Sequence, residues 1–367
     1  MEDTDGKVVD KPSEMAEVLR KHWEKVFQKK APNMDVMKRW FSTLENRTRP
    51  DPPEEGPDAR GTPRQRQQDQ MSVGAFCKFD MPLKRRRKIR RRISNNHEHW
   101  KVRQKDIRQA IRTSNNSSPG PDGIPFGAWR ATKEVGENIL LDVIECMESD
   151  TAEEDFLEAY KDEAKQGEHL FNTSTLVCLP KDPSGEDPSM GKYYLAKATR
   201  PLSIVNSDNR LIASAMRIRW ETQLAQYVKE RQQGFLRKRS ILKNLVEVDT
   251  AMMMTALKGD RGAALFLDFE AAFPSIDQEY VHETLKWIGL PDETLNSFRF
   301  LYKQCKCNIS VKGETFDGFG MGAGVRQGCP LSPLVYVLVA ETLLDMLEVV
   351  VDDIMVRAYA HDTALVV

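Results

Sequence analysis

The sequence predicts an α+β fold, because segments of helical periodicity and segments of strand type both recur along its 367 residues. Short apolar runs between turn residues predict strands at 174–181, 199–206 and 263–268, a strand pair over 305–321, and a hairpin with strands at 354–360 and 363–367. Apolar residues at helical spacing predict helices at 12–30, 98–113, around Trp129, and at 134–168, 207–229, 240–257, 278–288, 293–303 and 332–349. The length suits two or three domains, or one large domain with an extension.

The composition indicates a polar globular chain, with 40% hydrophobic and 30% charged residues. No apolar run reaches the roughly 20 residues that cross a bilayer, so we expect no membrane contact. The acidic N-terminus lacks the apolar core of a signal peptide, and the six cysteines are scattered as in a reducing compartment. These features predict a location in the nucleus or cytoplasm. Because the formal net charge is only -1, any nucleic-acid surface must come from local clusters of charge.

Residues 1–97 are predicted to form an N-terminal extension ahead of a domain at 98–367. The helix at 12–30 is expected to pack on a domain, although a partner-binding helix is the alternative. Residues 50–70 carry almost no apolar side chains and are therefore interpreted as a linker. A dense basic run follows, made of Lys84, Arg85, Arg86, Arg87, Lys88, Arg90, Arg91 and Arg92. It is sufficient to bind nucleic-acid phosphates or to act as a nuclear import signal, and a solvated tail without a partner is the alternative.

Two later segments carry more specific expectations. In the helical region 134–168, an apolar stripe is predicted to be buried, consisting of Ile139, Leu140, Val143, Ile144 and Met147. Residues 182–191 are rich in Pro, Gly and Asp and are interpreted as a turn region.

An aspartate at the end of the strand at 263–268 is the first chemical signal. A buried unpaired carboxylate is very costly, so Asp268 indicates a strand end that faces solvent or a metal ligand. A cap on the following helix is the alternative.

Three motifs then occur in order: FLDFEAAF at 266–273, GVRQGCPLSP at 324–333 and YAHD at 359–362. Together they resemble the palm motifs of reverse transcriptases from non-LTR (LINE-type) retrotransposons. Segments at 118–125, 200–203, 233–235 and 239–241 occur in the order that this family shows. Group II intron and telomerase-type polymerases share the palm, but the decamer at 324–333 favours the non-LTR type. The resemblance covers about residues 98–367.

The resemblance implies the fingers and palm of a right-hand polymerase. The chain ends at Val367, five residues after Asp362, so we expect the thumb to be absent. The implied function is RNA-directed DNA polymerisation, with an RNA template, a DNA primer and deoxynucleoside triphosphates as partners. The oligomeric state is left open.

The resemblance also implies a two-metal site for Mg²⁺, with Mn²⁺ as an alternative ion. Asp268 and Asp362 match the metal-binding aspartates, and the backbone carbonyl of Phe269 is expected to assist. Two ions roughly 3.5–4 Å apart stabilise the attacking and leaving oxygens in such reactions. Because Asp268 and Asp362 are 94 residues apart in the sequence, only the fold can bring them together.

Five further residues match nucleotide-binding positions of the family. Lys181 and Arg200 are expected to hold the nucleotide phosphates. Phe273 matches the residue that excludes a ribose 2′-hydroxyl, with ordinary core packing as the alternative. Gln327 and Gly328 match the turn against the incoming nucleotide, with a purely structural turn as the alternative.

One position departs from the family pattern. Where the family has the first aspartate of a Tyr-Ala-Asp-Asp turn, this chain has His361. Neutral imidazole is a poor ligand for Mg²⁺, so the activity is expected to be impaired. The alternatives are a catalytically inactive nucleic-acid-binding fragment and a fragment that folds poorly.

Overall fold

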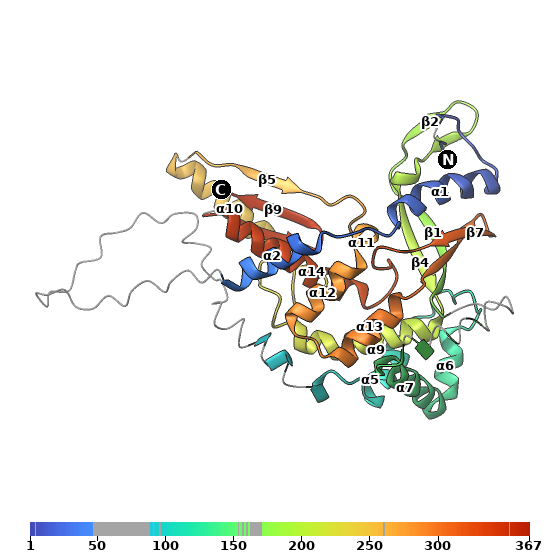
Figure 1. Ribbon diagram of the computed structural model, residues 1–367. Coiled ribbons are helices and arrows are strands. Elements are labelled where there is room, and N and C mark those ends of the chain that lie inside the picture. The colour runs from blue at the N-terminus through green and yellow to red at the C-terminus, as the bar shows by residue number, and fades with distance from the viewer. Residues whose placement is uncertain are drawn as a thin grey trace, which may run out of the picture. The chain divides into compact units, whose positions relative to one another are not determined.

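The fold is described in a computed structural model of the chain. It describes residues 1–46, 89–161 and 171–367, apart from positions 4, 91, 95–96, 153, 156–157, 159–160, 260 and 352. The chain divides into two compact units (Figure 1). The first comprises Met1–Pro32, Ile93–Leu224 and Glu270–Tyr336, and the second comprises Asn33–Arg92, Ala225–Phe269 and Val337–Val367. Helices and sheets are both present, as the predicted class requires. The expected boundary at residue 97 stays a prediction.

A mixed sheet with the strand order β4-β1-β6-β7 organises the first unit. Strand β1 (Thr173–Pro180) pairs antiparallel with β4 (Thr199–Val205) and parallel with β6 (Lys306–Val311). Strands β6 and β7 (Glu314–Gly320) form the predicted hairpin.

Helix α1 (Pro12–Val26) packs on this sheet, in agreement with the expectation that it covers a domain. Its Trp23 indole donates a hydrogen bond to the Thr199 hydroxyl over 3.2 Å. The helix ends at Val26 instead of residue 30, and Phe27 is fully buried.

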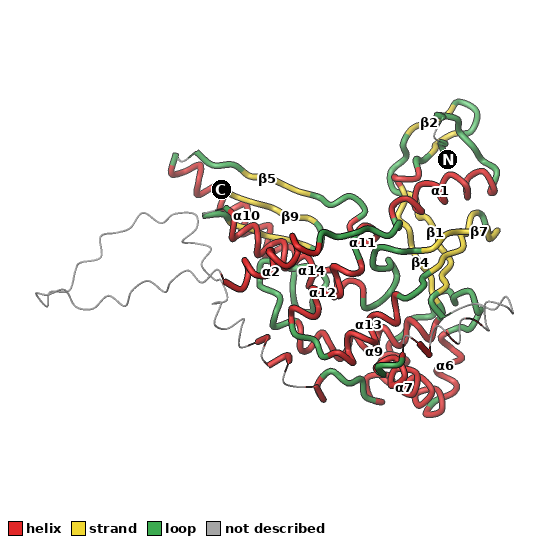
Figure 2. The backbone as a smooth tube through the Cα atoms, in the orientation of Figure 1, coloured by secondary structure: helices red, strands yellow, loops and turns green. Residues whose placement is uncertain are grey.

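A short hairpin of β2 (Gly185–Asp187) and β3 (Gly191–Tyr193) occupies the segment predicted as a turn region (Figure 2). The Asp187 carboxylate accepts hydrogen bonds from the backbone N–H groups of Ser189 and Met190, which tightens the turn. The strands are too short for an alternating pattern, so the turn chemistry alone was visible in the sequence.

The remaining helices of the first unit agree with the predictions apart from their ends and a few short turns that were not predicted. They are α5 (Gln104–Thr113), α6 (Phe126–Thr132), α7 (Glu134–Glu148), α9 (Ser207–Leu224), α11 (Ala272–Ser275), α12 (Gln278–Ile288) and α13 (Asp292–Tyr302), with 3-10 turns at His97–His99 and Ala196–Ala198. Of the predicted stripe on α7, Leu140, Ile144 and Met147 are buried, but Ile139 is 48% exposed, so its predicted burial was wrong. The buried part of the stripe packs where α13, α5 and α6 contact α7.

An antiparallel sheet with the order β5-β9-β8 organises the second unit. It contains β5 (Ala264–Leu267), β8 (Met355–Tyr359) and β9 (Asp362–Val366), as expected from residues 263–268 and 354–367. Within the described part of this unit, the main helices are α2 (Met34–Asn46), which was not predicted, α10 (Ile241–Lys258) and the C-terminal part of α14 (Ser332–Val350).

Helices cover both faces of the β8-β9 hairpin. Val248 and Ala251 of α10 pack against the register partners Met355 and Val366. Leu344 of α14 packs in a second cluster with Val356, Ala358 and Leu365. Successive strand residues point to opposite faces, so the two clusters lie on opposite sides of the hairpin. The hairpin is therefore held firmly, whereas β5 is an edge strand whose residues are all exposed.

Candidate functional site

The end of the second unit's sheet brings three polar side chains together. Asp268 directly follows β5, His361 lies in the turn between β8 and β9, and Asp362 begins β9. Leu267 pairs with Thr363 in this antiparallel sheet. Asp268, which follows Leu267, and Asp362, which precedes Thr363, are therefore neighbours. The Nδ1 atom of His361 lies 3.0 Å from Asp268 Oδ1 and 3.6 Å from Asp362 Oδ1. The pairing of β5 with β9 thus brings together residues that are far apart in the sequence.

These three side chains offer the donor atoms of a cation site. One ligand atom from each lies within 4.8 Å of the others. The side chains of Asp268, His361 and Asp362 are 72%, 39% and 64% exposed, so a hydrated ion and a substrate can reach them. Carboxylate oxygens suit hard divalent cations, and an imidazole nitrogen suits transition metals. Phe269, the expected source of an assisting carbonyl, follows Asp268, and its side chain is 42% exposed.

The turn that carries His361 is clamped by the buried side chain of Gln232. The Gln232 Oε1 atom accepts hydrogen bonds from the N–H groups of Ala360 (2.8 Å) and Gly234 (2.9 Å). Its Nε2 atom donates to the Ala360 carbonyl over 3.1 Å. Ala360 has φ +58°, a conformation that costs free energy for a residue with a Cβ atom. The bonds from Gln232 therefore hold the turn in an unfavourable backbone conformation.

Glycine is required at position 234 for close approach. A Cβ atom on Gly234 would lie 2.2 Å from the Ala360 nitrogen. The same loop continues the pairing along β8, because Gln233 N–H donates to the Ala358 carbonyl and Ala358 N–H donates to the Arg231 carbonyl, both over 2.8 Å. The segment from Arg231 to Gly234 thus supports the hairpin turn from behind.

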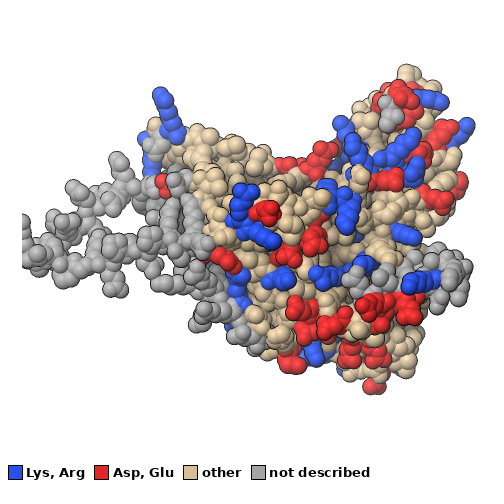
Figure 3. All heavy atoms as spheres, in the orientation of Figure 1, with Lys and Arg blue, Asp and Glu red and all other residues tan. Residues whose placement is uncertain are grey.

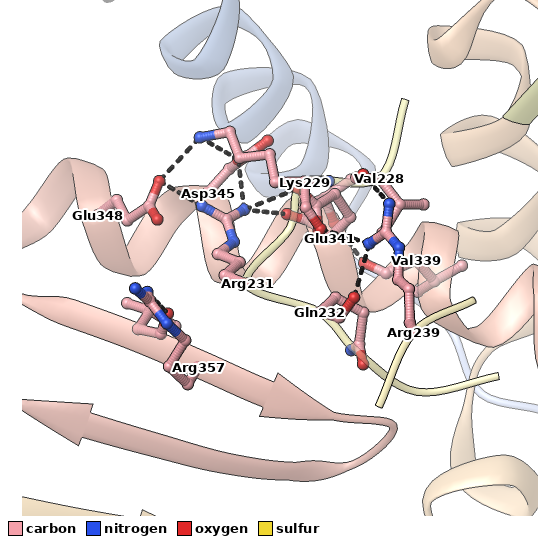
Figure 4. A network of polar contacts seen from close by, with 12 residues as sticks. Val228, Lys229, Arg231, Gln232, Arg239, Val339, Glu341, Asp345, Glu348 and Arg357 are labelled. Carbon is pink, nitrogen blue, oxygen red and sulfur yellow. Dashed lines mark hydrogen bonds and ion pairs between the residues drawn. The ribbon is translucent and has the colours of Figure 1, made fainter. Parts of the chain in front are cut away.

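A buried network of charges anchors this loop to α14 (Figure 4). The Arg231 guanidinium bonds Glu341 Oε1 at 3.0 Å and Asp345 Oδ1 at 2.6 Å, and it forms an ion pair with Glu348. Lys229 adds ion pairs to Glu348 at 2.8 Å and to Asp345 at 3.3 Å. Burial alone would lower the pKa of Arg231, but the three carboxylates outweigh it and raise the pKa above its ordinary value.

A second arginine fastens the backbone of the loop. Arg239 donates hydrogen bonds to the carbonyl oxygens of Lys229 and Gln232, both over 2.6 Å, and to that of Val228 over 2.7 Å (Figure 4). The carbonyl groups of a non-helical buried loop are satisfied in this way.

Lys181 and Arg200 lie at one end of the β1-β4 pair in the first unit, Lys181 just after β1 and Arg200 on β4. Arg200 on β4 pairs with Leu179 of β1, and Lys181 directly follows the end of β1, where its N–H donates to the Ala198 carbonyl over 2.9 Å. Strand alternation places Lys181 on the face that Leu179 and Arg200 share. Both side chains are exposed, so their positive charges are accessible to solvent.

Gln327 and Gly328 form a turn that packs against β4 in the first unit. The Ser203 N–H donates to the Gln327 carbonyl over 2.8 Å. Gly328 has φ +110°, and a Cβ atom there would lie 2.7 Å from the Ser203 carbonyl oxygen. The glycine thus serves close backbone packing, and a role toward a nucleotide stays a prediction.

Phe273 has a packing role in the structure. Its side chain is 9% exposed, and its ring stacks on Tyr336 with 4.8 Å between the ring centroids. This is the alternative that the sequence left open, and the expected exclusion of a 2′-hydroxyl stays a prediction.

Two buried residues that hold these motifs in place were not predicted from the sequence. Arg326, at 1% exposure, donates to the Leu301 carbonyl over 2.7 Å and lies over the Tyr302 ring. Gln232 is fully buried. Arg326 lies inside the recognised motif at 324–333 and Gln232 directly precedes the one at 233–235, and these positions are the signal that could have found them.

The basic run is only partly described. Its residues Lys84, Arg85, Arg86, Arg87, Lys88 and Arg91 lie outside the described residues. Arg90 forms an ion pair with Glu45 over 3.0 Å, and Arg92 is exposed. On the face drawn in Figure 3, basic and acidic side chains are interspersed, in keeping with the near-zero net charge.

Among the described residues, no helix combines the length and the apolar character that a membrane span needs.

Comparisons with known proteins give a consistent result. The sequence model of the family described as reverse transcriptase (RNA-dependent DNA polymerase) matches residues 180–367. The chain is 26% identical over 273 residues to the transposon TX1 uncharacterized 149 kDa protein of Xenopus laevis, which covers 71% of this chain and 19% of that protein. It is 25% identical over 249 residues to the Pol polyprotein of the type-2 retrotransposable element R2DM of Drosophila melanogaster, covering 66% of this chain and 20% of that protein.

The chain therefore spans about a fifth of the length of these relatives. Among solved structures, a partial Cas6-RT-Cas1–Cas2 complex is similar at 15% identity with a TM-score of 0.32, over 62% of this chain and 38% of that one.

Proposed function

Because the chain belongs to the reverse transcriptase (RNA-dependent DNA polymerase) family, we propose that its sheet end at Asp268 and Asp362 is the catalytic centre of template-directed DNA synthesis. The retrotransposon relatives confirm the sequence-based assignment to a reverse transcriptase domain of the non-LTR type. The single observation that carries the catalytic proposal is the pairing of β5 with β9, which sets Asp268 beside the hairpin turn.

In this proposal, one unit contains the palm of the polymerase and the other contains the fingers. The β5-β9-β8 sheet is the palm, and the β4-β1-β6-β7 sheet belongs to the fingers. The expected partners are an RNA template, a DNA primer and deoxynucleoside triphosphates, which this family generally uses. In support, the palm sheet presents carboxylates at its end, and the fingers sheet presents the cations of Lys181 and Arg200.

Asp268 and Asp362 would hold the divalent ions, Mg²⁺ or Mn²⁺, that this family generally uses. When bound, such ions stabilise the charge on the attacking and leaving oxygens. The exposed carboxylates bind and orient the reacting groups at the sheet end. Lys181 and Arg200 bind the negatively charged triphosphate. Their positive charges also neutralise the charge that develops on the leaving group.

His361 limits the rate in this proposal. Its imidazole stands where the family has a carboxylate, so one anionic ligand is missing from the catalytic centre. The loss of several kcal/mol of transition-state stabilisation lowers the rate on the order of a thousandfold. Restoring the carboxylate with His361→Asp is expected to raise the rate by about that factor.

Primer extension on an RNA template tests the proposal, first with Mg²⁺ and then with Mn²⁺. The chain itself, His361→Asp, and Asp268→Ala in the His361→Asp background are compared. Asp249→Ala in the same background is the matched control, because Asp249 is an exposed aspartate on α10 outside the site. We expect strong extension in His361→Asp, its loss with Asp268→Ala, and no loss with Asp249→Ala. Equal extension with and without the Asp268 carboxylate would show the assignment to be wrong.

A second candidate function is nucleic-acid binding without chemistry, which the imidazole at position 361 favours. Binding of a primer–template duplex that weakens steeply with salt, without nucleotide addition by any variant, would support it.

A further inference from the structure

The position of His361 between two carboxylates has a consequence for the choice of metal. Its Nδ1 atom lies 3.0 Å from Asp268 Oδ1 and 3.6 Å from Asp362 Oδ1. These atoms are close enough for all three residues to bind one cation, because their ligand atoms lie within 4.8 Å of one another.

The distances fit adjacent ligands on a small divalent ion. Bonds of about 2.0–2.2 Å separate neighbouring ligand atoms by roughly 3.0 Å in octahedral and 3.4 Å in tetrahedral coordination. Both separations from His361 Nδ1 match this range within a few tenths of an ångström. The 3.0 Å contact is a hydrogen bond between His361 and Asp268, which a bound ion would replace by two metal–ligand bonds.

The donor set selects among divalent ions. Mg²⁺ is hard and prefers oxygen, whereas imidazole nitrogen suits transition ions such as Co²⁺ and Zn²⁺. We propose that Asp268, His361 and Asp362 form one mixed nitrogen–oxygen site that binds a divalent transition-metal ion in preference to Mg²⁺. This proposal rests on the proposed function for the location of the catalytic centre, and it names the ion class that this chain's version of the centre accepts.

The charge of the site supports the same choice. Two carboxylates and a neutral imidazole balance a single divalent ion, whereas a third carboxylate would leave an excess negative charge. Mg²⁺ gains most from such negative oxygen ligands, and a transition ion gains from the covalent bond to nitrogen as well. The 39% exposure of the His361 side chain leaves the remaining coordination positions open to water or to a phosphate.

A second cluster in the first unit must be separated from this one in any measurement. Glu279, His282 and Glu283 on α12 also place ligand atoms within 4.8 Å of one another. His282 Nδ1 lies 3.2 Å from its neighbour Glu283 Oε1, and the His282 ring is buried, at 5% exposure. The measurement therefore depends on differences between variants at position 361.

The test is a titration of the full chain with Co²⁺ alone, followed by visible absorption and repeated in the presence of Mg²⁺. We expect a Co²⁺ absorption band that persists in an approximately hundredfold excess of Mg²⁺ and is lost in His361→Ala. In His361→Asp, the ratio of Co²⁺ to Mg²⁺ affinity is expected to fall at least about tenfold. His99→Ala, which removes an exposed histidine elsewhere, should leave the band unchanged.

An identical band in the chain and in His361→Ala, or complete displacement by the Mg²⁺ excess, would overturn the proposal. The measurement needs no nucleic acid, so it is independent of primer extension. If His361→Asp extends primers but the chain shows no His361-dependent Co²⁺ band, the metal proposal fails while the proposed function stands. If a His361-dependent band appears but no variant extends a primer, the proposed function fails while the metal proposal stands.

Discussion

At the scale of single residues, Gln232 holds the turn that carries His361, although its side chain faces the backbone and not the solvent. Its three hydrogen bonds satisfy the N–H groups of Ala360 and Gly234 and the Ala360 carbonyl. In Gln232→Ala these buried groups lose their partners, and a buried unsatisfied group costs about 1–3 kcal/mol. We expect the free energy of unfolding to fall by at least about 1–3 kcal/mol, the cost of a single unsatisfied group.

Urea denaturation measures this change. In Gln109→Ala, an exposed glutamine on α5 is removed, and a change within about 0.5 kcal/mol is expected. A second variant, Gln232→Glu, separates positioning from stability. It keeps the size of the side chain and its two accepted hydrogen bonds but loses the donor to the Ala360 carbonyl. Its primer extension is measured in the His361→Asp background. A Gln232→Ala variant as stable as the unchanged chain would contradict the role of the clamp.

Asp208 makes stability depend on pH. Burial, and less strongly the charge of Asp122, raise its pKa to about 6. The folded state therefore binds the proton more tightly than the unfolded state, whose carboxyl has an ordinary pKa of about 3.9. Ionisation of Asp208 therefore lowers the free energy of unfolding. This loss is absent below about pH 4 and grows as pH rises to about 6, reaching at most about 3 kcal/mol.

In Asp208→Asn this loss of stability is expected to disappear. The variant should be more stable than the unchanged chain at pH 7 and equally stable near pH 3.5, as urea denaturation at both pH values can measure. A stability difference that does not change between these pH values would speak against a raised pKa at Asp208.

Buried polar residues also mark where residue-level prediction failed. Asp268 was recognised because a carboxylate at the end of an apolar strand conflicts with burial. Gln232 and Arg326 give no such conflict in the sequence, since their burial depends on partners that come from distant segments. Arg326 donates to Leu301, and Gln232 bonds Ala360, 128 residues further on.

At the element scale, the loop before α10 is joined to α14 by ion pairs. Replacing Arg231 by methionine would leave the carboxylates of Glu341 and Asp345 buried without their main counter-charge. Breaking such a buried pair from one side costs about 3–5 kcal/mol. The expected result is a loss of unfolding free energy of this size in Arg231→Met.

Arg20→Met on α1 is the matched control for that change. Arg20 pairs with Glu17 and Glu24 while its side chain is 33% exposed, so its loss should cost at most about 1 kcal/mol. Chemical denaturation compares the two variants directly. Equal effects of the two substitutions would mean that burial of the Arg231 network adds nothing to its strength.

Elements with clear periodicity or caps were predicted well. Helix α12 has the predicted bounds, and it is capped by Asp277 at its start and by Gly289 in a left-handed conformation at its end. Helix α10 begins after the predicted Ser240, whose hydroxyl accepts from Leu242 N–H. The hairpin of β2 and β3 was not predicted, because the turn centred on Asp187 holds it. Helix α9 ends at Leu224 instead of residue 229, although apolar residues continue beyond it.

At the scale of the whole molecule, charge is balanced, with 54 basic and 55 acidic residues. Affinity for nucleic acid must therefore come from places where cations gather, and the run at 84–92 is the densest in the sequence. The affinity of a protein that neutralises phosphates falls with salt, with a slope of about -0.9 per neutralised phosphate on a duplex and about -0.7 on a single strand.

We expect replacement of five cations of the run by glutamine to flatten that dependence. The substituted residues are Lys84, Arg85, Arg86, Arg87 and Lys88. The slope of log affinity against log salt should become less negative by up to about 4.5, measured by fluorescence anisotropy with a labelled RNA–DNA duplex. The control replaces five dispersed exposed lysines, namely Lys11, Lys21, Lys133, Lys192 and Lys258. Because the same net charge is removed in both variants, an equal change in slope would mean that total charge, and not the basic run, determines binding.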